Sequence, residues 1–141
     1  MTDRYNLHQF YSGEASTVKY ILFEEPTQEA YDAEYLRIVR PTTAMPKKAL
    51  EKIERDWIET LPKLNKARGI SIASPKQDIF EAVCQITHLE KLFISSSRIN
   101  DISNIGKLNK LRRLQFSSCT QLTDIAPITH LNNLELLSFE N

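Results

Sequence analysis

The feature that most constrains this chain is a repeat of about 22 residues in its second half. When LEKLFISSSRINDISNIGKLNK (89–110) is set above LRRLQFSSCTQLTDIAPITHLNN (111–133), the apolar residues of the two stretches coincide. With one inserted residue near Gln121, seven pairs match: Leu89 with Leu111, Leu92 with Leu114, Ile94 with Phe116, Ile99 with Leu122, Ile102 with Ile125, Ile105 with Ile128, and Leu108 with Leu131. A third copy begins at 134–141, and a degraded copy occupies 67–88. Units this short cannot bury their own apolar faces, so they must stack on one another.

The spacing within a unit predicts its local structure. In L-x-x-L-x-L the last two apolar residues are two positions apart, so they point to the same side of a β-strand. The later apolar residues follow in steps of three, which suits a helical or 3₁₀ return on the opposite side. Stacked units therefore predict an α/β solenoid, with a parallel sheet on its inner, concave wall and helical segments on its outer, convex side.

This pattern resembles the leucine-rich repeat family, L-x-x-L-x-L-x-x-N/C-x-L, in the class with units of about 22 residues. The segments NDISNI (100–105) and TDIAPI (123–128) look like the corresponding part of bacterial internalin-type repeats. The resemblance covers residues 67–141, with one degraded, two complete and one truncated repeat. It implies a non-enzymatic module that binds another protein of unknown identity.

Cys119 occupies the ninth position of its unit, where the family carries Asn or Cys turned inward to the loop backbone. Ser97 and Pro75 hold that position in the two preceding units, so a continuous buried asparagine ladder is not expected. A buried cysteine behaves as a small hydrophobe, and we favour that role over the alternative of a catalytic thiol. With Cys84, and with no secretory leader visible, it suggests free thiols in a reducing compartment such as the cytoplasm.

Residues 46–66 are predicted to form a capping helix and a connector. PKKALEKIERDWIETL (46–61) places apolar residues at steps of three and four along one face. These residues are Leu50, Ile53, Trp57, Ile58 and Leu61. The helix is expected to cover the N-terminal end of the solenoid, as stacked repeats require. Trp57 would then be its largest buried side chain; an exposed Trp57 that anchors a partner is the alternative.

Residues 1–45 are predicted to form a small strand-containing segment. TVKYILFEE (17–25) and YLRIVR (35–40) are rich in residues that favour strands, and PTQEAYDAE (26–34) suits a short helix or turn. YNLHQFYS (5–12) is placed to pair with the strand at 17–25 through an intervening turn. The chain is thus expected to divide into this segment, the helical connector and the repeats.

Composition and motifs point away from catalysis, nucleic acid and membranes. Basic and acidic residues number 18 each, so no net field attracts nucleic acid or anionic lipid. No apolar stretch reaches the roughly 18–20 residues that span a bilayer. KLNKLRR (107–113) holds four cations, but a nucleic-acid surface should carry more charge and interleaved aromatic residues. We therefore predict no enzyme activity, no cofactor, no nucleic-acid partner and no membrane partner.

The histidines and two aspartates are the remaining candidates for a metal site. His8, His88 and His130 lack nearby cysteines or carboxylates at ligand spacing, so solvent-facing side chains are favoured over metal ligands. Asp101 and Asp124 share one position of successive units, and paired carboxylates could serve acid–base catalysis or bind calcium. We favour the alternative, in which each carboxylate accepts hydrogen bonds from backbone N–H groups at the start of its return segment.

The inner wall is the predicted partner-binding surface, because it presents side chains from successive strands on a rigid support. Eight residues lie between and beside its core positions: Lys91, Phe93, Ser95, Arg113, Gln115, Ser117, Leu136 and Ser138. Phe93 is expected to be exposed beside Lys91 and Arg113, an aromatic and cationic mixture typical of protein interfaces. Exchanging both cations for glutamate is expected to abolish partner capture with little change in thermal stability.

Two further hypotheses remain open. The last unit stops at Asn141 before its return segment, so its open end is expected to be covered by further repeats or by another chain. The chain would then be the targeting or regulatory N-terminal part of a longer repeat protein or enzyme. An enzyme within residues 1–45 is the other hypothesis, but no nucleophile–base pair is visible there.

Overall fold

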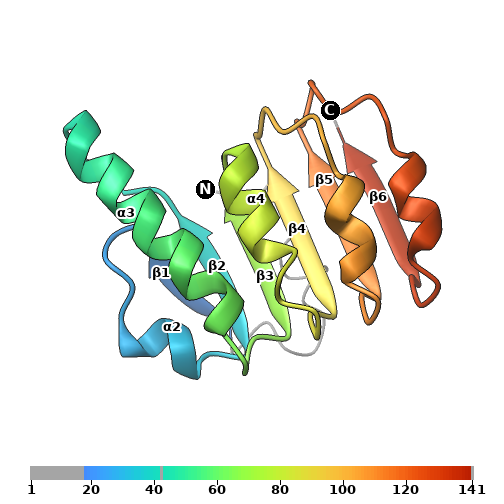
Figure 1. Ribbon diagram of the computed structural model, residues 1–141, viewed down its shortest axis with the longest axis horizontal. Helices are drawn as coiled ribbons and strands as arrows, with labels where there is room; N and C mark the ends of the chain where they lie inside the picture. Colours follow the sequence, from blue (N-terminus) through green and yellow to red (C-terminus); the bar gives the residue numbers. More distant parts are fainter. Residues whose placement is uncertain (1–17, 42, 141) are drawn as a thin grey trace.

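A single sheet of parallel strands runs through the protein, and the strands follow one another in sequence order (Figure 1). The computed structural model describes residues 18–41 and 43–140. Its strands are β1 (Lys19–Leu22), β2 (Tyr35–Val39), β3 (Gly69–Ala73), β4 (Lys91–Ser95), β5 (Arg113–Ser117) and β6 (Leu136–Glu140). Parallel neighbours require a crossover between each pair, so each connecting segment must return along a face of the sheet. The predicted α/β solenoid with a parallel sheet is confirmed.

The return segments lie on one face of the sheet, where α3 and α4 cover the strands in Figure 1. They are α2 (Gln28–Asp32), α3 (Lys47–Thr60) with η2 (Leu61–Lys63), α4 (Gln77–Val83), η3 (Ser103–Lys107) and η4 (Ala126–His130). The later returns are 3₁₀ helices, as predicted from apolar residues in steps of three. This face is the convex side of the solenoid.

The core lies between the sheet and these returns. Ile70, Leu92 and Leu114 are partners in one row across β3, β4 and β5, and all three side chains are fully buried. Ile94 and Phe116 are partners in the next row and are equally buried. Residues two apart on a strand point to the same face, so the apolar repeat lines the sheet side of the core as expected.

The strands predicted at 17–25 and 35–40 are present as β1 and β2, with the helix α2 between them. β1 pairs in parallel with β2, and β2 pairs in parallel with β3, so both strands belong to the same sheet as the repeats. The segment 5–12, expected to pair with β1, lies outside the described residues. Strands from both sides of residues 46–66 belong to one sheet, and the three-part division of the chain stays a prediction.

The helix predicted at 46–61 is present as α3, and its role as a cap of the repeats stays a prediction, although it does not lie at the end of the sheet. Among the described strands β1 lies at the N-terminal edge, and α3 connects β2 to β3 as a return segment. The reason is that β1 and β2 extend the sheet beyond the helix. Trp57 on α3 is completely buried, which confirms its predicted core role and excludes an exposed anchor.

Three serines turn the chain out of successive strands. Ser74, Ser96 and Ser118 are the first residues after β3, β4 and β5, and their φ angles are 56°, 52° and 54°. Such left-handed conformations are uncommon for residues other than glycine. Each serine N–H donates to the last residue of the next strand, for example Ser96 N to Ser117 O at 2.8 Å. The repeat is therefore preserved in the backbone turns as well as in the core.

Candidate functional site

The eight inner-wall residues predicted from sequence lie in rows across neighbouring strands. Each row is formed by residues that share a register position on β4, β5 and β6. The rows are Lys91–Arg113–Leu136, Phe93–Gln115–Ser138 and Ser95–Ser117–Glu140. Because alternate side chains of a strand point to opposite faces, these residues all face away from the core between the sheet and the returns. The structure brings the predicted set together on one wall.

Most of that wall is buried, which contradicts the expectation of an exposed Phe93. Phe93 is 1% exposed, and Lys91, Ser95, Gln115 and Ser117 are also buried. Part of the reason is that a residue on a central strand is flanked in register on both sides, as Phe93 is by Ser71 and Gln115. Phe93 therefore has the environment of a core residue.

The accessible part of the wall lies over β5 and β6. Leu136 is 43% exposed, and Arg113 and Ser138 are partly exposed. Leu136 is the register partner of Arg113, so an apolar and a cationic side chain lie next to each other at this end. We call Arg113, Leu136 and Ser138 the β5–β6 surface.

Lys91 is a buried cation that packs near an aromatic ring, and it is not an exposed surface group. It is 6% exposed, and its Nζ lies 5.8 Å from the centre of the Tyr35 ring. The Arg68 guanidinium lies 5.7 Å from the same ring. Aromatic faces favour cations, so glutamate at position 91 would place an unfavourable charge there. Exchanging Lys91 together with Arg113 is therefore not a clean test of binding, contrary to the expectation from sequence.

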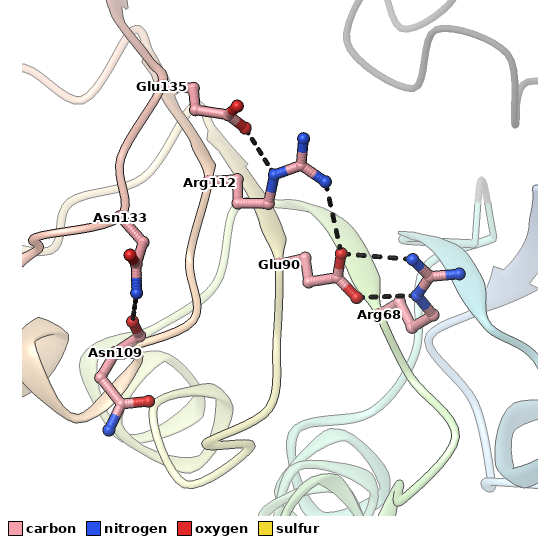
Figure 2. A network of polar contacts seen from close by, with 6 residues as sticks. All are labelled: Arg68, Glu90, Asn109, Arg112, Asn133 and Glu135. Carbon is pink, nitrogen blue, oxygen red and sulfur yellow. Dashed lines mark hydrogen bonds and ion pairs between the residues drawn. The ribbon is translucent and has the colours of Figure 1, made fainter.

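A chain of ion pairs runs along the edge where the strands begin (Figure 2). Arg68 Nε lies 2.7 Å from Glu90 Oε2, and Arg112 Nη1 lies 3.8 Å from Glu90 Oε1. Arg112 also pairs with Glu135 through its Nε. Each of these residues immediately precedes a strand, so stacking brings opposite charges from successive repeats together. Sequence reasoning missed this network, although its signal is the alternation of sign at positions 68, 90, 112 and 135.

Glu90→Gln is expected to lower the free energy of unfolding by roughly 1 kcal/mol near neutral pH, the upper range for a partly exposed network. The hydrogen bond from Arg68, together with the charges of Arg68 and Arg112, lowers the pKa of Glu90 below its ordinary value. A lowered folded-state pKa stabilises the fold above the unfolded carboxyl's pKa, and this contribution disappears as the pH falls through the folded value. Denaturant titrations at a series of pH values should therefore show that the difference in free energy of unfolding between wild type and variant becomes smaller from neutral to acidic pH.

The matched control for that experiment is Glu59→Gln, because Glu59 is exposed on α3 and has no ion pair among the described residues. This variant should follow the wild-type pH dependence. A stability difference for Glu90→Gln that stays constant down to acidic pH would contradict an ionic origin. The test thus separates the charge network from a general effect of removing a carboxylate.

The ninth repeat position is filled by small side chains that bond to the loop backbone. Ser97 Oγ donates to the Pro75 carbonyl at 2.7 Å and accepts from Ile99 N at 3.2 Å. Cys119 is 8% exposed, and its thiol lies 3.7 Å from the Ile94 carbonyl. Burial raises the pKa of Cys119, which opposes formation of the thiolate that a nucleophile requires. The structural role predicted for Cys119 is confirmed.

The aspartates lie in turns as predicted, and of the two described histidines His130 faces solvent as expected but His88 does not. Ser103 N donates to Asp101 Oδ1 at 2.8 Å, and Ala126 N donates to Asp124 Oδ1 at 3.0 Å, as predicted. His130 is exposed, whereas His88 is half-buried and its Nε2 has no hydrogen-bond partner among residues 18–41 and 43–140. His8 lies outside that range. Within it, no cluster of three or more His, Cys, Asp or Glu could hold a metal ion, and no helix is long and apolar enough to cross a membrane.

Comparison with known proteins agrees with this geometry. Residues 87–133 match the family model described as leucine-rich repeats, in two copies. These residues are leucine-rich repeats. Internalin C2 from Listeria monocytogenes, a solved structure, is 18% identical to the chain with a TM-score of 0.59, covering 82% of this chain and 46% of that one. The chain thus spans less than half of that protein's length, and no curated protein matches it.

The leucine-rich repeat assignment accounts for the features that the sequence indicated. The family match spans the two units whose apolar residues coincide, and the likeness to internalin C2 extends the shared fold over most of the chain. Leucine-rich repeat domains stack their units into curved solenoids with extended concave binding surfaces, and they are generally protein-interaction modules. They are typically non-enzymatic.

Proposed function

We propose that this chain is a non-enzymatic module that binds another protein through the β5–β6 surface of its inner wall. The observation that carries the proposal is the exposure of Leu136, 43%, beside its register partner Arg113. The buried part of the wall, including Phe93 and Lys91 on β4, lies beside this surface in the same rows of the sheet. A partner would contact the open end of the wall rather than its centre.

The chemistry of this end suits a protein partner. Contacts at protein interfaces combine buried apolar anchors with arginine and a polar rim, and Leu136, Arg113 and Ser138 supply one of each. Leu137 and Phe139, on the other face of β6, are 41% and 45% exposed. A cluster of exposed apolar side chains on one strand favours association with another polypeptide.

A second proposal rests on the same strand. Among the described strands β6 lies at the edge of the sheet, and its outer backbone groups have no strand partner there. With Leu137 and Phe139 exposed, a further repeat or another chain could extend the sheet and cover both side chains. The chain would then act as a targeting or regulatory part of a larger assembly.

Exchanging Arg113→Glu together with Leu136→Ser is expected to reduce partner capture at least tenfold, because it reverses the charge and removes the apolar contact at the proposed surface. Affinity capture from a lysate of the source organism, quantified by mass spectrometry, measures the change. Thermal unfolding of the purified variant should show that it remains folded.

The matched control exchanges Lys19→Glu and Leu22→Ser on β1, at the other end of the sheet. Both side chains are exposed, and Leu22 at 50% resembles Leu136. This control should capture the same protein as the wild type. Undiminished capture by the Arg113 and Leu136 variant would contradict the β5–β6 surface, and loss in both variants would point to a less specific effect.

The cysteines support placing this module in a reducing compartment such as the cytoplasm, which we include in the proposal. Cys84 and Cys119 are both free and buried. Burial raises the pKa of Cys84 to about 12, so its thiol stays protonated at neutral pH. Free buried thiols are common where disulfides do not form.

A further inference from the structure

A hollow lies where β3 and β4 end, at the opposite ends of the strands from the ion pairs of Glu90 and Arg112. Its volume is about 400 Å³. Three cations and three serines are among its lining residues: Arg40, Lys76, Arg98, Ser74, Ser96 and Ser97. None of the described residues that line it is acidic. This composition contrasts with the starting edge of the strands, where cations and carboxylates alternate.

The repeat geometry explains why the cations meet there. Lys76 and Arg98 are the third residues after β3 and β4, so they hold the same position of successive units. Arg40 is the first residue after β2, the strand on the other side of β3. The ends of parallel strands meet at one edge of a sheet, and neighbouring strands are roughly 5 Å apart. The cluster is therefore built by the fold itself and does not depend on chain flexibility.

The charges of two of these cations are not neutralised within the described part of the chain. Arg40 donates from Nη2 to the Ser74 carbonyl at 3.1 Å, and its guanidinium lies 5.0 Å from the centre of the Phe23 ring. Both contacts orient the group without compensating its charge. Arg98 is exposed and has no ion pair with a described residue. Lys76 differs, because its Nζ lies 3.1 Å from the buried carboxylate of Glu54.

We propose that this hollow binds a phosphate group, either as the free ion or on a phosphorylated side chain of another protein. A phosphate monoester carries about −1.5 to −2 charges at neutral pH, which matches the two uncompensated arginines better than a single carboxylate does. Guanidinium groups bind phosphate through two parallel hydrogen bonds, and serine hydroxyls such as that of Ser74 add donors. The site is separate from the β5–β6 surface, so the proposal stands independently of it.

The volume bears on the source of the phosphate. A hollow of about 400 Å³ leaves room beyond one phosphate ion, and ligand pockets for larger molecules begin at roughly 300 Å³. Arg98 is exposed at its rim and Arg40 is held against Phe23, so a ligand would approach from the solvent past Arg98. A phosphoserine with its flanking backbone would fill more of this space than the free ion.

The test is an NMR titration of the full chain at constant ionic strength, following the amides of Ser74, Ser96 and Arg98. The probes are inorganic phosphate, a short phosphoserine peptide and its unphosphorylated twin. We expect saturable shifts at these amides with phosphate or the phosphopeptide and none with the twin. Arg98→Gln should weaken binding about tenfold, the effect expected from losing one charge-assisted contact.

Lys110→Gln is the matched control, because it removes one exposed cation from the loop before β5, at the other edge of the sheet. It should bind the probe like the wild type. Saturable binding of phosphate itself supports a site for the free ion, and binding of the phosphopeptide alone supports a phosphorylated protein. The proposal is overturned if neither probe binds, if the twin binds equally well, or if Arg98→Gln and Lys110→Gln change the affinity to the same extent.

Discussion

Replacing Trp57 with alanine is expected to lower the free energy of unfolding by about 3–5 kcal/mol, the range for truncating a large buried aromatic residue. Trp57 is completely buried between α3 and the sheet. Its ring stacks on Phe23 with the centroids 5.9 Å apart, and its Nε1 donates to the Glu24 carbonyl at 2.7 Å. Alanine would leave a cavity and a carbonyl without its donor, and both effects destabilise the folded state.

Urea titration followed by far-ultraviolet circular dichroism measures this change, since Trp57 is the only tryptophan and its fluorescence disappears with it. Trp57→Phe is the informative comparison, because it keeps an aromatic ring but removes the hydrogen bond. Trp57→Phe should lower the free energy of unfolding by less than Trp57→Ala does, about 1–2 kcal/mol. A loss below 1 kcal/mol for Trp57→Ala would contradict the tight packing of α3 against the segment after β1, and would restore the view of α3 as a peripheral cap.

The repeat itself was predictable because its signal is local and repeated. The apolar residues of 89–110 and 111–133 alternate two apart in the strands and three apart in the returns, and each period selects one type of element. Repetition then excludes a chance pattern, and the register Leu92–Leu114 and Ile94–Phe116 follows directly from the alignment. The same logic placed Cys119 in the loop interior.

The place of α3 was not predictable from its own residues. An amphipathic helix shows the same apolar stripe whether it closes the end of a solenoid or returns between two strands. The distinction depends on β1 and β2, whose sequences 17–25 and 35–40 are predicted to form strands but are not assigned to the repeats. The pairing of β1 with β2 and of β2 with β3 is a tertiary feature that local strand propensity does not predict.

The candidate site shows the same limit at the level of single side chains. The alternation of residues along a strand correctly assigned Phe93, Gln115 and Ser138 to one face of the sheet. Alternation predicts only the face to which a side chain points. Exposure depends on what else lies against that face, so Phe93 at 1% and Leu136 at 43% could not be distinguished from the pattern. The charge network involving Glu90 was overlooked for a different reason: its members are 22 or 23 residues apart, and the search followed apolar positions.

Phe93→Ala decides between the two roles of the inner wall. Because Phe93 is 1% exposed, its truncation to alanine is expected to lower the free energy of unfolding of the protein by about 3–4 kcal/mol. An exposed contact residue would lose little stability, because surface substitutions usually change it by less than about 0.5 kcal/mol. Urea titration of the purified variant gives the value directly.

Phe139→Ala provides the internal scale for that result. Phe139 on β6 is 45% exposed and keeps one stacking partner, Phe116, with ring centroids 5.5 Å apart. Phe139→Ala should therefore lower the free energy of unfolding by less than Phe93→Ala does, about 1–2 kcal/mol. If Phe93→Ala proved the milder of the two and also abolished partner capture, the centre of the wall would be an open contact surface. If Phe93→Ala destabilises the protein more than Phe139→Ala does, the partner must bind where the wall is accessible, at Arg113 and Leu136.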